Sequence, residues 1–201
     1  MGAGRNGGVE MTAVSYRRYT RTPELRQLKR CMKNRFPLLL AEGFGVGRIP
    51  FAPGTFGSLV GLLWFALLLL PGNVWVFFAG ALAGVGVSVR ACGEAEKILD
   101  RKDPGCVVLD EIIAMPLCFV VWVAMSAGAS GALPGLSFVF VQHWPWVLAG
   151  FVLFRVFDVL KPWPVFQSQS LPGGWGVTMD DVLAAGYVNL ALAALHFAGA
   201  L

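Results

Sequence analysis

TMDDVLAAGYVNLALAALHFAGAL, residues 178–201, is the stretch of sequence that decides the fold class. Two aspartates stand near its start, and none of the residues from 182 to 201 is Asp, Glu, Lys or Arg. A helix needs about 20 apolar residues to cross the hydrocarbon core of a bilayer. Residues 182–201 therefore predict a membrane-spanning helix that begins beside a pair of ionisable side chains.

Four shorter apolar segments have the same character. They are Phe56–Leu70, Val74–Val89, Ile112–Ala127 and Trp146–Leu160, and the stretch Phe36–Phe44 adds a predicted half-helix at the membrane interface. The chain is 56% hydrophobic and 14% charged, whereas soluble domains carry about 25% charged residues. We therefore predict an all-α protein, a polytopic helical membrane bundle of about five spans.

The connections between these segments fall into two classes by charge. Residues 71–73 and 128–145 contain no Lys, Arg, Asp or Glu, whereas the N-terminal arm and residues 90–111 and 161–181 carry nearly all of them. Five spans would place the two classes on opposite sides of the membrane. Because cytoplasmic loops carry an excess of Lys and Arg, we expect the charged side to face the cytoplasm and the C-terminus to lie outside.

Residues 1–35 form a basic arm ahead of a membrane-embedded domain at residues 36–201. The basic residues of the arm are Arg5, Arg17, Arg18, Arg21, Arg26, Lys29, Arg30, Lys33 and Arg35. Such a run predicts an anchor to anionic lipid of the bilayer, with each basic residue contributing about 1 kcal/mol near the surface. The first twenty residues are expected to be disordered. Nucleic acid is disfavoured as a partner because a membrane domain follows.

Five carboxylates gather at the predicted cytoplasmic ends of the spans. Asp110 and Glu111 precede the third span, Asp158 lies in the last turns of the fourth, and Asp180 and Asp181 open the fifth. Carboxylates in a small space repel one another unless a cation neutralises them. Hard oxygen ligands without histidine suit Mg²⁺ better than zinc. The pattern therefore predicts a Mg²⁺ site made by these five side chains.

Cations and glycine-rich turns complete the predicted site. Arg155 and Lys161 each lie three residues from Asp158, which places all three on one helix face. Residues 43–58 and 173–176 are glycine-rich turns that run into spans, where backbone N–H groups can approach an anion. Such turns beside a carboxylate cluster indicate a phosphate, to which Thr55 and Ser58 would add hydroxyl donors.

Structural roles could explain each group of charges taken alone. Thr178-x-x-Asp181 has the form of a capping box, Asp110 and Glu111 open a helix, and Arg155 with Asp158 could be a plain ion pair. Ionisable residues at membrane depth are costly and generally mark functional sites. Three groups at the same depth on neighbouring helix ends therefore favour a function.

The residue types narrow the chemistry. His143 and His196 are expected on the side opposite the carboxylates, which disfavours a phosphohistidine, and no DxDxT motif supplies an aspartyl nucleophile. The remaining mechanism for a phosphatase is attack of a metal-activated water molecule on phosphorus. The alternative is a non-catalytic ion-binding or transport protein, but its acids would be expected near the bilayer midplane rather than at span ends.

Four segments resemble the phosphatidylglycerophosphatase A family. They are LLLAEGFGVGRIPFAPGTFGSL (38–59), VVLDEIIAMP (107–116), FVLFRVFDVLKPWPV (151–165) and GGWGVTMDDVLAA (173–185), and they occur in the family's order. The resemblance runs from about Phe36 to the C-terminus. It implies a Mg²⁺-dependent enzyme of phospholipid biosynthesis that hydrolyses phosphatidylglycerophosphate to phosphatidylglycerol and phosphate at the cytoplasmic face of the bacterial inner membrane.

The same motifs imply roles for individual residues. The implied metal ligands are Asp110, Glu111, Asp158, Asp180 and Asp181, and all of these except Asp180 are the implied catalytic groups. The implied substrate-binding residues are Gly54, Thr55, Ser58, Arg155 and Lys161. Glu42 and Arg48 depart from the family pattern, because many relatives are expected to carry uncharged residues there. We expect them to pair with each other rather than to join the metal site.

Overall fold

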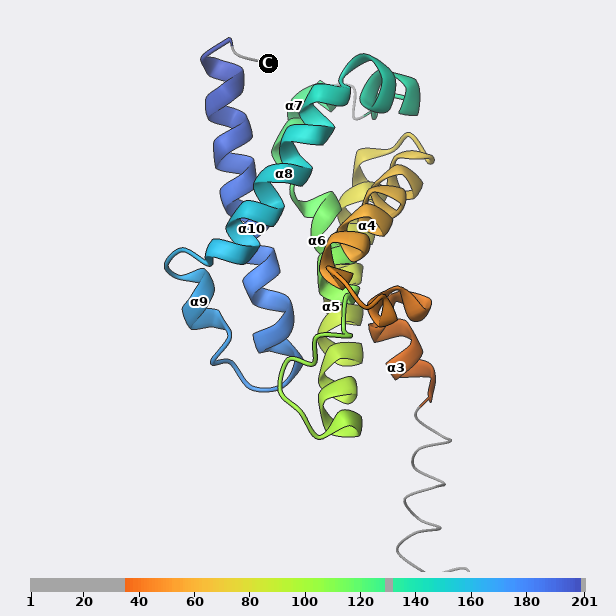
Figure 1. The fold of residues 1–201 in the computed structure, drawn as a ribbon. Helices are drawn as coiled ribbons and strands as arrows, with labels where there is room; N and C mark the ends of the chain where they lie inside the picture. The colour runs from red at the N-terminus through yellow and green to blue at the C-terminus, as the bar shows by residue number, and fades with distance from the viewer. Residues whose placement is uncertain (1–34, 129–131, 200–201) are drawn as a thin grey trace, which may run out of the picture. The chain divides into compact units, whose positions relative to one another are not determined.

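The computed structural model describes residues 35–128 and 132–199, and within these ranges the chain is helical without a β-strand (Figure 1). The all-α prediction is confirmed. The elements are, in chain order, α3 (Arg35–Ala41), the 3₁₀-helix η1 (Gly43–Arg48), α4 (Pro53–Leu69), α5 (Val74–Leu99), α6 (Leu109–Leu117), α7 (Val120–Ala127), the π-helix η3 (Phe138–Gln142), α8 (Trp144–Leu160), α9 (Val165–Ser168) and α10 (Gly174–Phe197). The predicted disordered part of the basic arm lies outside the described residues.

Three of the described helices are long and apolar enough to cross a membrane. They are α5, α10 and the combination of α6 and α7, Leu109–Ala127, which is interrupted after Leu117. The helices α4 and α8 have 17 residues each, or about 25 Å at 1.5 Å per residue. That is shorter than a hydrocarbon core of about 30 Å. By length and composition, three helices are therefore candidate spans, and the predicted count of about five stays a prediction.

The connections without charge meet at one end of the helical domain. Figure 1 shows the turn after α4, the segment between α7 and α8 and the C-terminal end of α10 at this end, with the C-terminal end of α5 at the other. The backbone N–H of Leu133 donates to the carbonyl of Gly72 at 3.0 Å and joins the two connections directly. The side-chain oxygen of Asn73 accepts from the N–H of Trp75 at 2.9 Å, which caps the start of α5. The uncharged connections thus lie together, as the charge pattern predicted.

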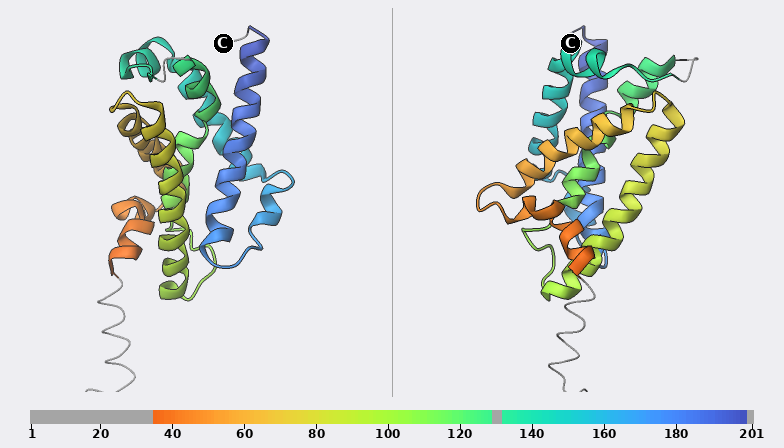
Figure 2. Two further views of the ribbon diagram at one scale, coloured as in Figure 1. Left: turned by 180° about the vertical axis from the view of Figure 1, so that it is seen from behind. Right: turned by 90° about the vertical axis from the view of Figure 1, so that its right-hand side faces the viewer.

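The helix α6 is central to the packing, against α4, α5 and α10 (Figure 2). Beside it lies an aromatic core: Phe65 of α4 stacks on Phe119 with ring centroids 4.7 Å apart and meets Phe77 of α5 edge-on at 6.0 Å. All three rings are fully buried. The helices α4, α5 and α10 thus surround α6, whose first turn carries two of the predicted carboxylates.

The first turns of α10 pack closely against α5. A Cβ atom on Gly174 would collide with the backbone carbonyl of Val89, so a glycine is required at this crossing. One turn further, the hydroxyl of Thr178 hydrogen-bonds to that of Ser88 at 2.9 Å. The predicted start of the last helix near residue 182 is therefore wrong, since the helix begins at Gly174. The capping-box interpretation of Thr178 is also wrong, because this residue lies inside the helix.

Candidate active site

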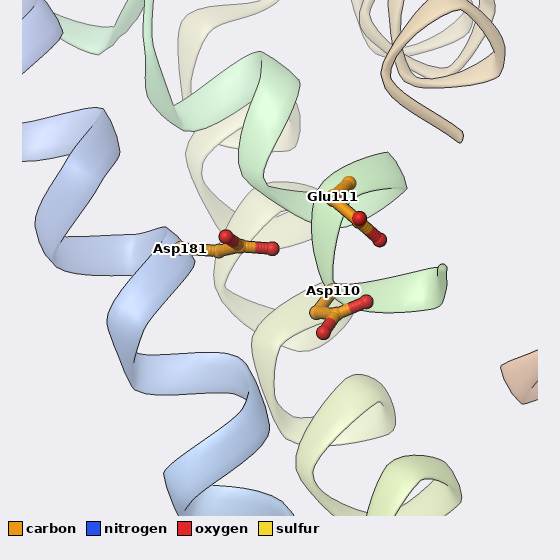
Figure 3. A group of neighbouring side chains, drawn as sticks. All are labelled: Asp110, Glu111 and Asp181. Carbon is orange, nitrogen blue, oxygen red and sulfur yellow. The ribbon is translucent and has the colours of Figure 1, made fainter. Parts of the chain in front are cut away.

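Three of the five predicted carboxylates form one cluster. Asp110 and Glu111 come from the first turn of α6, and Asp181 points toward them from α10 (Figure 3). One oxygen of each lies within 4.8 Å of an oxygen of the other two. Asp110 and Asp181 are buried, with 7% and 3% of their surface exposed. Two helices thus bring three acidic side chains together in the interior of the helical domain.

Two oxygens of this cluster have no donor from the protein. Oδ1 of Asp110 and Oε2 of Glu111 are buried and lack a hydrogen-bond partner among the described residues, although buried polar atoms in proteins nearly always have one. The N-cap residue of α6, Val108, makes no side-chain cap bond. Unpaired carboxylate oxygens are the ligands that a hard divalent cation prefers. The residues present therefore fit a divalent metal ion.

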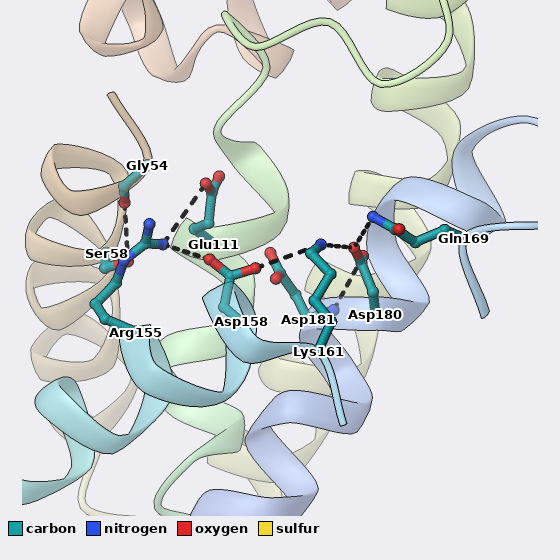
Figure 4. A network of polar contacts seen from close by, with 9 residues as sticks. All are labelled: Gly54, Ser58, Glu111, Arg155, Asp158, Lys161, Gln169, Asp180 and Asp181. Atoms are coloured by element: carbon teal, nitrogen blue, oxygen red, sulfur yellow. Dashed lines mark hydrogen bonds and ion pairs between the residues drawn. The ribbon is translucent and has the colours of Figure 1, made fainter. Parts of the chain in front are cut away.

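The other two carboxylates belong to a chain of alternating charges (Figure 4). Nη1 of Arg155 lies 2.8 Å from Oδ2 of Asp158 and 3.9 Å from Oε1 of Glu111. Nζ of Lys161 lies 3.6 Å from Oδ1 of Asp158 and 2.5 Å from Oδ2 of Asp180. The predicted helix face of Arg155, Asp158 and Lys161 is confirmed. Asp158 and Asp180 thus form close ion pairs with Arg155 and Lys161. The cluster of three has only the contact of 3.9 Å between Glu111 and Arg155.

The charges of this region do not balance. Five carboxylates, Asp110, Glu111, Asp158, Asp180 and Asp181, face the two cations of Arg155 and Lys161, which leaves a net charge of −3 if all are ionised. Buried like charges strongly disfavour the ionised state unless something compensates them. One divalent cation in the cluster of three would remove most of the excess.

Asp180 has two further hydrogen bonds that hold it away from the cluster. Its Oδ2 accepts from Nε2 of Gln169 at 3.0 Å, and its Oδ1 accepts from the backbone N–H of Asp181 at 3.1 Å. Sequence reasoning did not identify Gln169 as part of the site. It follows the short helix α9 and belongs to no recognisable spacing, so only its contact with Asp180 reveals it.

Lys161 is held in its charged form by these neighbours. Burial by itself would lower the pKa of Lys161, but the hydrogen bond and charge of Asp180, together with the charges of Asp158 and Asp181, raise the pKa above its usual value. The ammonium group therefore remains protonated throughout the neutral range.

The first turn of α4 closes the site on another side. A Cβ atom on Gly54 would collide with Oε1 of Glu111 and lie 3.2 Å from both terminal nitrogens of Arg155, so a larger residue here would displace these two side chains. Thr55 follows in the same turn and is half-buried. Ser58 is fully buried and donates to the carbonyl of Gly54 at 2.9 Å. The predicted glycine-rich turn thus lies against both the acid cluster and its nearest cation.

Two further predictions concern residues outside the cluster. Glu42 is buried and pairs with Arg48 at 2.7 Å, as expected for two residues that compensate each other. His143 precedes α8 and His196 lies in the last turn of α10. Fifteen residues of helix, or about 22 Å, separate His196 from Asp181. The histidines are therefore remote from the carboxylates, as the sequence predicted.

Comparisons with known proteins identify the family. The family model described as phosphatidylglycerophosphatase A matches residues 39–196, which include every site residue described above. The phosphatidylglycerophosphatase A of Escherichia coli is 34% identical over 163 residues, covering 80% of this chain and 82% of that protein. The phosphatidylglycerophosphatase A of Haemophilus influenzae is 36% identical over 160 residues, covering 79% and 88%.

A protein of Bacteroides thetaiotaomicron that is provisionally named phosphatidylinositol-3-phosphatase is 36% identical over 162 residues, covering 78% of this chain and 91% of that protein. No solved structure matches the chain. The family match extends over most of the chain and contains both the acid cluster and the ion-pair chain. The chain therefore belongs to the phosphatidylglycerophosphatase A family, a family of phosphatases.

Proposed function

We propose that the protein hydrolyses phosphatidylglycerophosphate to phosphatidylglycerol and inorganic phosphate in a Mg²⁺-dependent step of phospholipid biosynthesis. One observation carries the proposal: Asp110 and Glu111 each have a buried carboxylate oxygen without a donor, and the guanidinium of Arg155 lies 3.9 Å from the other oxygen of Glu111. Carboxylate oxygens that could bind a metal ion thus lie next to a guanidinium group that could bind a phosphate. The names of the relatives from E. coli and H. influenzae support this substrate.

Asp110, Glu111 and Asp181 would hold the metal ion. When bound, such an ion neutralises the carboxylates, acts as a Lewis acid toward phosphoryl oxygens and lowers the pKa of a ligated water. One carboxylate would orient the attacking water and accept its proton. The new bond joins the water oxygen to phosphorus and the bond from phosphorus to the glycerol oxygen breaks. That oxygen takes up a proton, and the carboxylate releases the one that it accepted from water, so the proton count is restored.

Arg155 and Lys161 would bind the phosphate. Nη1 of Arg155 is buried and makes no hydrogen bond of suitable geometry among the described residues, although Asp158 lies close to it. A guanidinium matches the oxygens of a phosphate and stabilises the charge that spreads over them in the transition state. Asp158 would become available as an additional ligand once Arg155 turns toward a bound phosphate.

The first turn of α4 would contribute further donors. A helix N-terminus favours negative charge, and Gly54 and Thr55 lie in such a turn. The backbone N–H of Thr55 already donates to the carbonyl of Ala52 at 3.0 Å, so Thr55 would contribute its hydroxyl and Gly54 its N–H. The hydroxyl of Ser58, which donates to Gly54, would help to hold this turn in place or turn toward the phosphate itself.

We also infer five spans in the bacterial inner membrane, with the site at the cytoplasmic face. The helices α4 and α8 would cross where the bilayer thins or where their ends are covered by protein. The shared end of the two uncharged connections supports this arrangement, and the positive-inside rule assigns the charged end to the cytoplasm.

Phosphate release by the detergent-purified protein tests the proposal. We expect release from phosphatidylglycerophosphate with Mg²⁺, none with EDTA, and a loss of at least about a thousandfold in Asp181→Asn. The matched control is Glu94→Gln, which removes a carboxylate from the exposed pair with Lys97 and should retain full activity. Phosphatidic acid and phosphatidylinositol 3-phosphate serve as competing substrates.

The outcomes separate the candidate functions. Faster turnover of phosphatidylinositol 3-phosphate would move the substrate assignment to that of the Bacteroides relative. If folded protein released phosphate from none of the three lipids but still bound Mg²⁺, the ion-binding alternative would replace the hydrolytic one.

A further inference from the structure

We propose that Gln169 is a positioning residue for the phosphate-binding cation: its amide holds Asp180, and Asp180 holds the ammonium group of Lys161 at the site. The inference rests on the proposed phosphatase function, which it deepens. Figure 4 shows the three side chains in one line, with the amide of Gln169 and the ammonium of Lys161 on the same oxygen of Asp180.

The carboxylate of Asp180 is fully engaged. Its Oδ2 accepts from Lys161 at 2.5 Å and from Gln169 at 3.0 Å, while its Oδ1 accepts from the backbone N–H of Asp181 at 3.1 Å. Three donors on one carboxylate determine both its position and its orientation. Asp180 therefore acts as an anchor for Lys161. Its three hydrogen bonds account for its burial without a contact to Asp110, Glu111 or the side chain of Asp181.

Lys161 requires such an anchor. It is the residue that ends α8, and its four-carbon stem is flexible, with three freely rotating donors. The contact with Asp158 is longer, at 3.6 Å, so the contact with Asp180 determines where the ammonium lies. A cation that binds a transferring phosphate must be held within a fraction of an ångström of its working position.

Gln169 itself is placed by backbone packing. The preceding residue, Ser168, is buried and donates its hydroxyl to the carbonyl of Val165 at 2.7 Å, which holds the turn together. The carbonyl of Gln169 lies so close to α10 that a Cβ atom on Gly176 would come within 2.9 Å of it. The amide side chain therefore projects from a rigid support toward Asp180, one turn further along α10.

The chain contains a matched control two residues away. Gln167 has the same side chain and belongs to the same short segment, but it is exposed, and its described hydrogen bonds use only its backbone carbonyl. Replacing Gln167 by Ala changes the local sequence to the same extent without touching Asp180.

The first test compares Gln169→Ala, Gln169→Glu and Gln167→Ala in steady-state phosphate release. We expect kcat/KM to fall about tenfold in Gln169→Ala, since a hydrogen bond to a charged group is lost, and to stay unchanged in Gln167→Ala. Glu has the same shape as Gln but cannot donate and brings a second negative charge. Gln169→Glu should therefore lose at least as much as Gln169→Ala, whereas a purely packing role would leave it close to wild type and overturn the proposal.

The second test asks whether Gln169 acts through Lys161. In a Lys161→Met background, Gln169→Ala should cause little further loss, because residues that act through one group are not additive. A full tenfold further loss in that background would contradict the proposal.

A third measurement keeps the inference separate from the proposed substrate. Titration of inorganic phosphate into the Mg²⁺-loaded protein should give a dissociation constant that rises about tenfold in Gln169→Ala and not in Gln167→Ala. If no lipid is hydrolysed but this difference is found, the proposed function fails and the role of Gln169 stands. Equal phosphate binding by wild type and Gln169→Ala would overturn the role of Gln169, whatever the activity.

Discussion

The side-chain oxygen of Asn189 accepts a hydrogen bond from the backbone N–H of Val121 at 3.0 Å, in the place where a continuous helix would use the carbonyl of Leu117. The amide nitrogen of Asn189 donates to that carbonyl at 2.7 Å. One side chain of α10 is thus inserted into the backbone hydrogen-bond ladder between α6 and α7, close to Pro116, which has no N–H to donate. The backbone N–H and carbonyl groups left free at the break in this candidate span therefore find their hydrogen-bond partner on α10.

Replacing Asn189 by Leu should therefore destabilise the helical domain. Val121 and Leu117 would lose their partners, although the backbone can recover part of the loss by re-forming its own hydrogen bond. We expect the free energy of unfolding to fall by about 1 kcal/mol, in line with hydrogen bonds between membrane helices. Reversible unfolding in mixed detergent and SDS micelles measures it, with Leu190→Ala at a neighbouring exposed position as the control. Unchanged unfolding of Asn189→Leu would contradict the assigned role.

Replacing Asp110 by Asn should stabilise the metal-free protein while abolishing turnover. The substitution removes the negative charge of one of three mutually repelling carboxylates and adds an NH2 group that can donate to the other two. The melting temperature in EDTA should therefore rise above that of wild type. Thermal unfolding followed in detergent with and without Mg²⁺ provides the measurement.

The same experiment reports on the cation. Mg²⁺ at a hundred times its dissociation constant stabilises a one-site protein by about 2.7 kcal/mol, and we expect this gain in wild type but not in Asp110→Asn. A wild-type protein whose melting temperature ignores Mg²⁺, Mn²⁺ and Ca²⁺ alike would argue against a metal at this cluster.

Replacing Gly54 by Ala should impair activity far more than folding. The new methyl group would push against Glu111 and the guanidinium of Arg155, and a displacement of about 1 Å can cost on the order of a hundredfold in rate. The matched control is Gly86→Ala, because a Cβ atom there meets nothing within 4 Å and a helical Gly→Ala change stabilises by up to about 1 kcal/mol. Full activity of Gly54→Ala would show that the first turn of α4 has no role in the reaction.

Lys161 and Asp180 should be energetically coupled. Removing either partner of a largely buried ion pair leaves the other charge uncompensated. Lys161→Met and Asp180→Asn should each destabilise the protein, and the double variant should lose about 1–3 kcal/mol less than the sum of the single changes. A double-mutant cycle of unfolding free energies measures the difference, and additive losses would show that the contact contributes nothing to stability.

Much of the helical architecture was determined by local sequence. Apolar runs of 15 to 20 residues predict helices wherever they occur, because a helix satisfies its own backbone hydrogen bonds in an apolar environment. The uncharged connections predicted a common end, which the hydrogen bond from Leu133 to Gly72 confirms. The helix face of Arg155, Asp158 and Lys161 was likewise predictable, since spacing of three along one helix is a local property.

The boundaries of the helices were harder to predict from the sequence, because tertiary packing overrides local signals. The last helix begins at Gly174 rather than near residue 182, since its glycine-rich first turn packs directly on α5. The predicted third span is divided between α6 and α7, where Asn189 substitutes for a backbone partner. Pro116 marks the region of the break, but in both cases the packing partner lies outside the segment concerned.

The sequence by itself determined that acids, cations and glycines gather at neighbouring helix ends; only the tertiary structure decided which of them share a partner. Asp180 and Asp181 are adjacent, yet successive helical residues point about 100° apart, so one joins Lys161 and Gln169 while the other joins Asp110 and Glu111. The direction of each side chain depends on the rotation and depth at which the helices pack. That is a property of long-range contacts, which a local pattern does not contain.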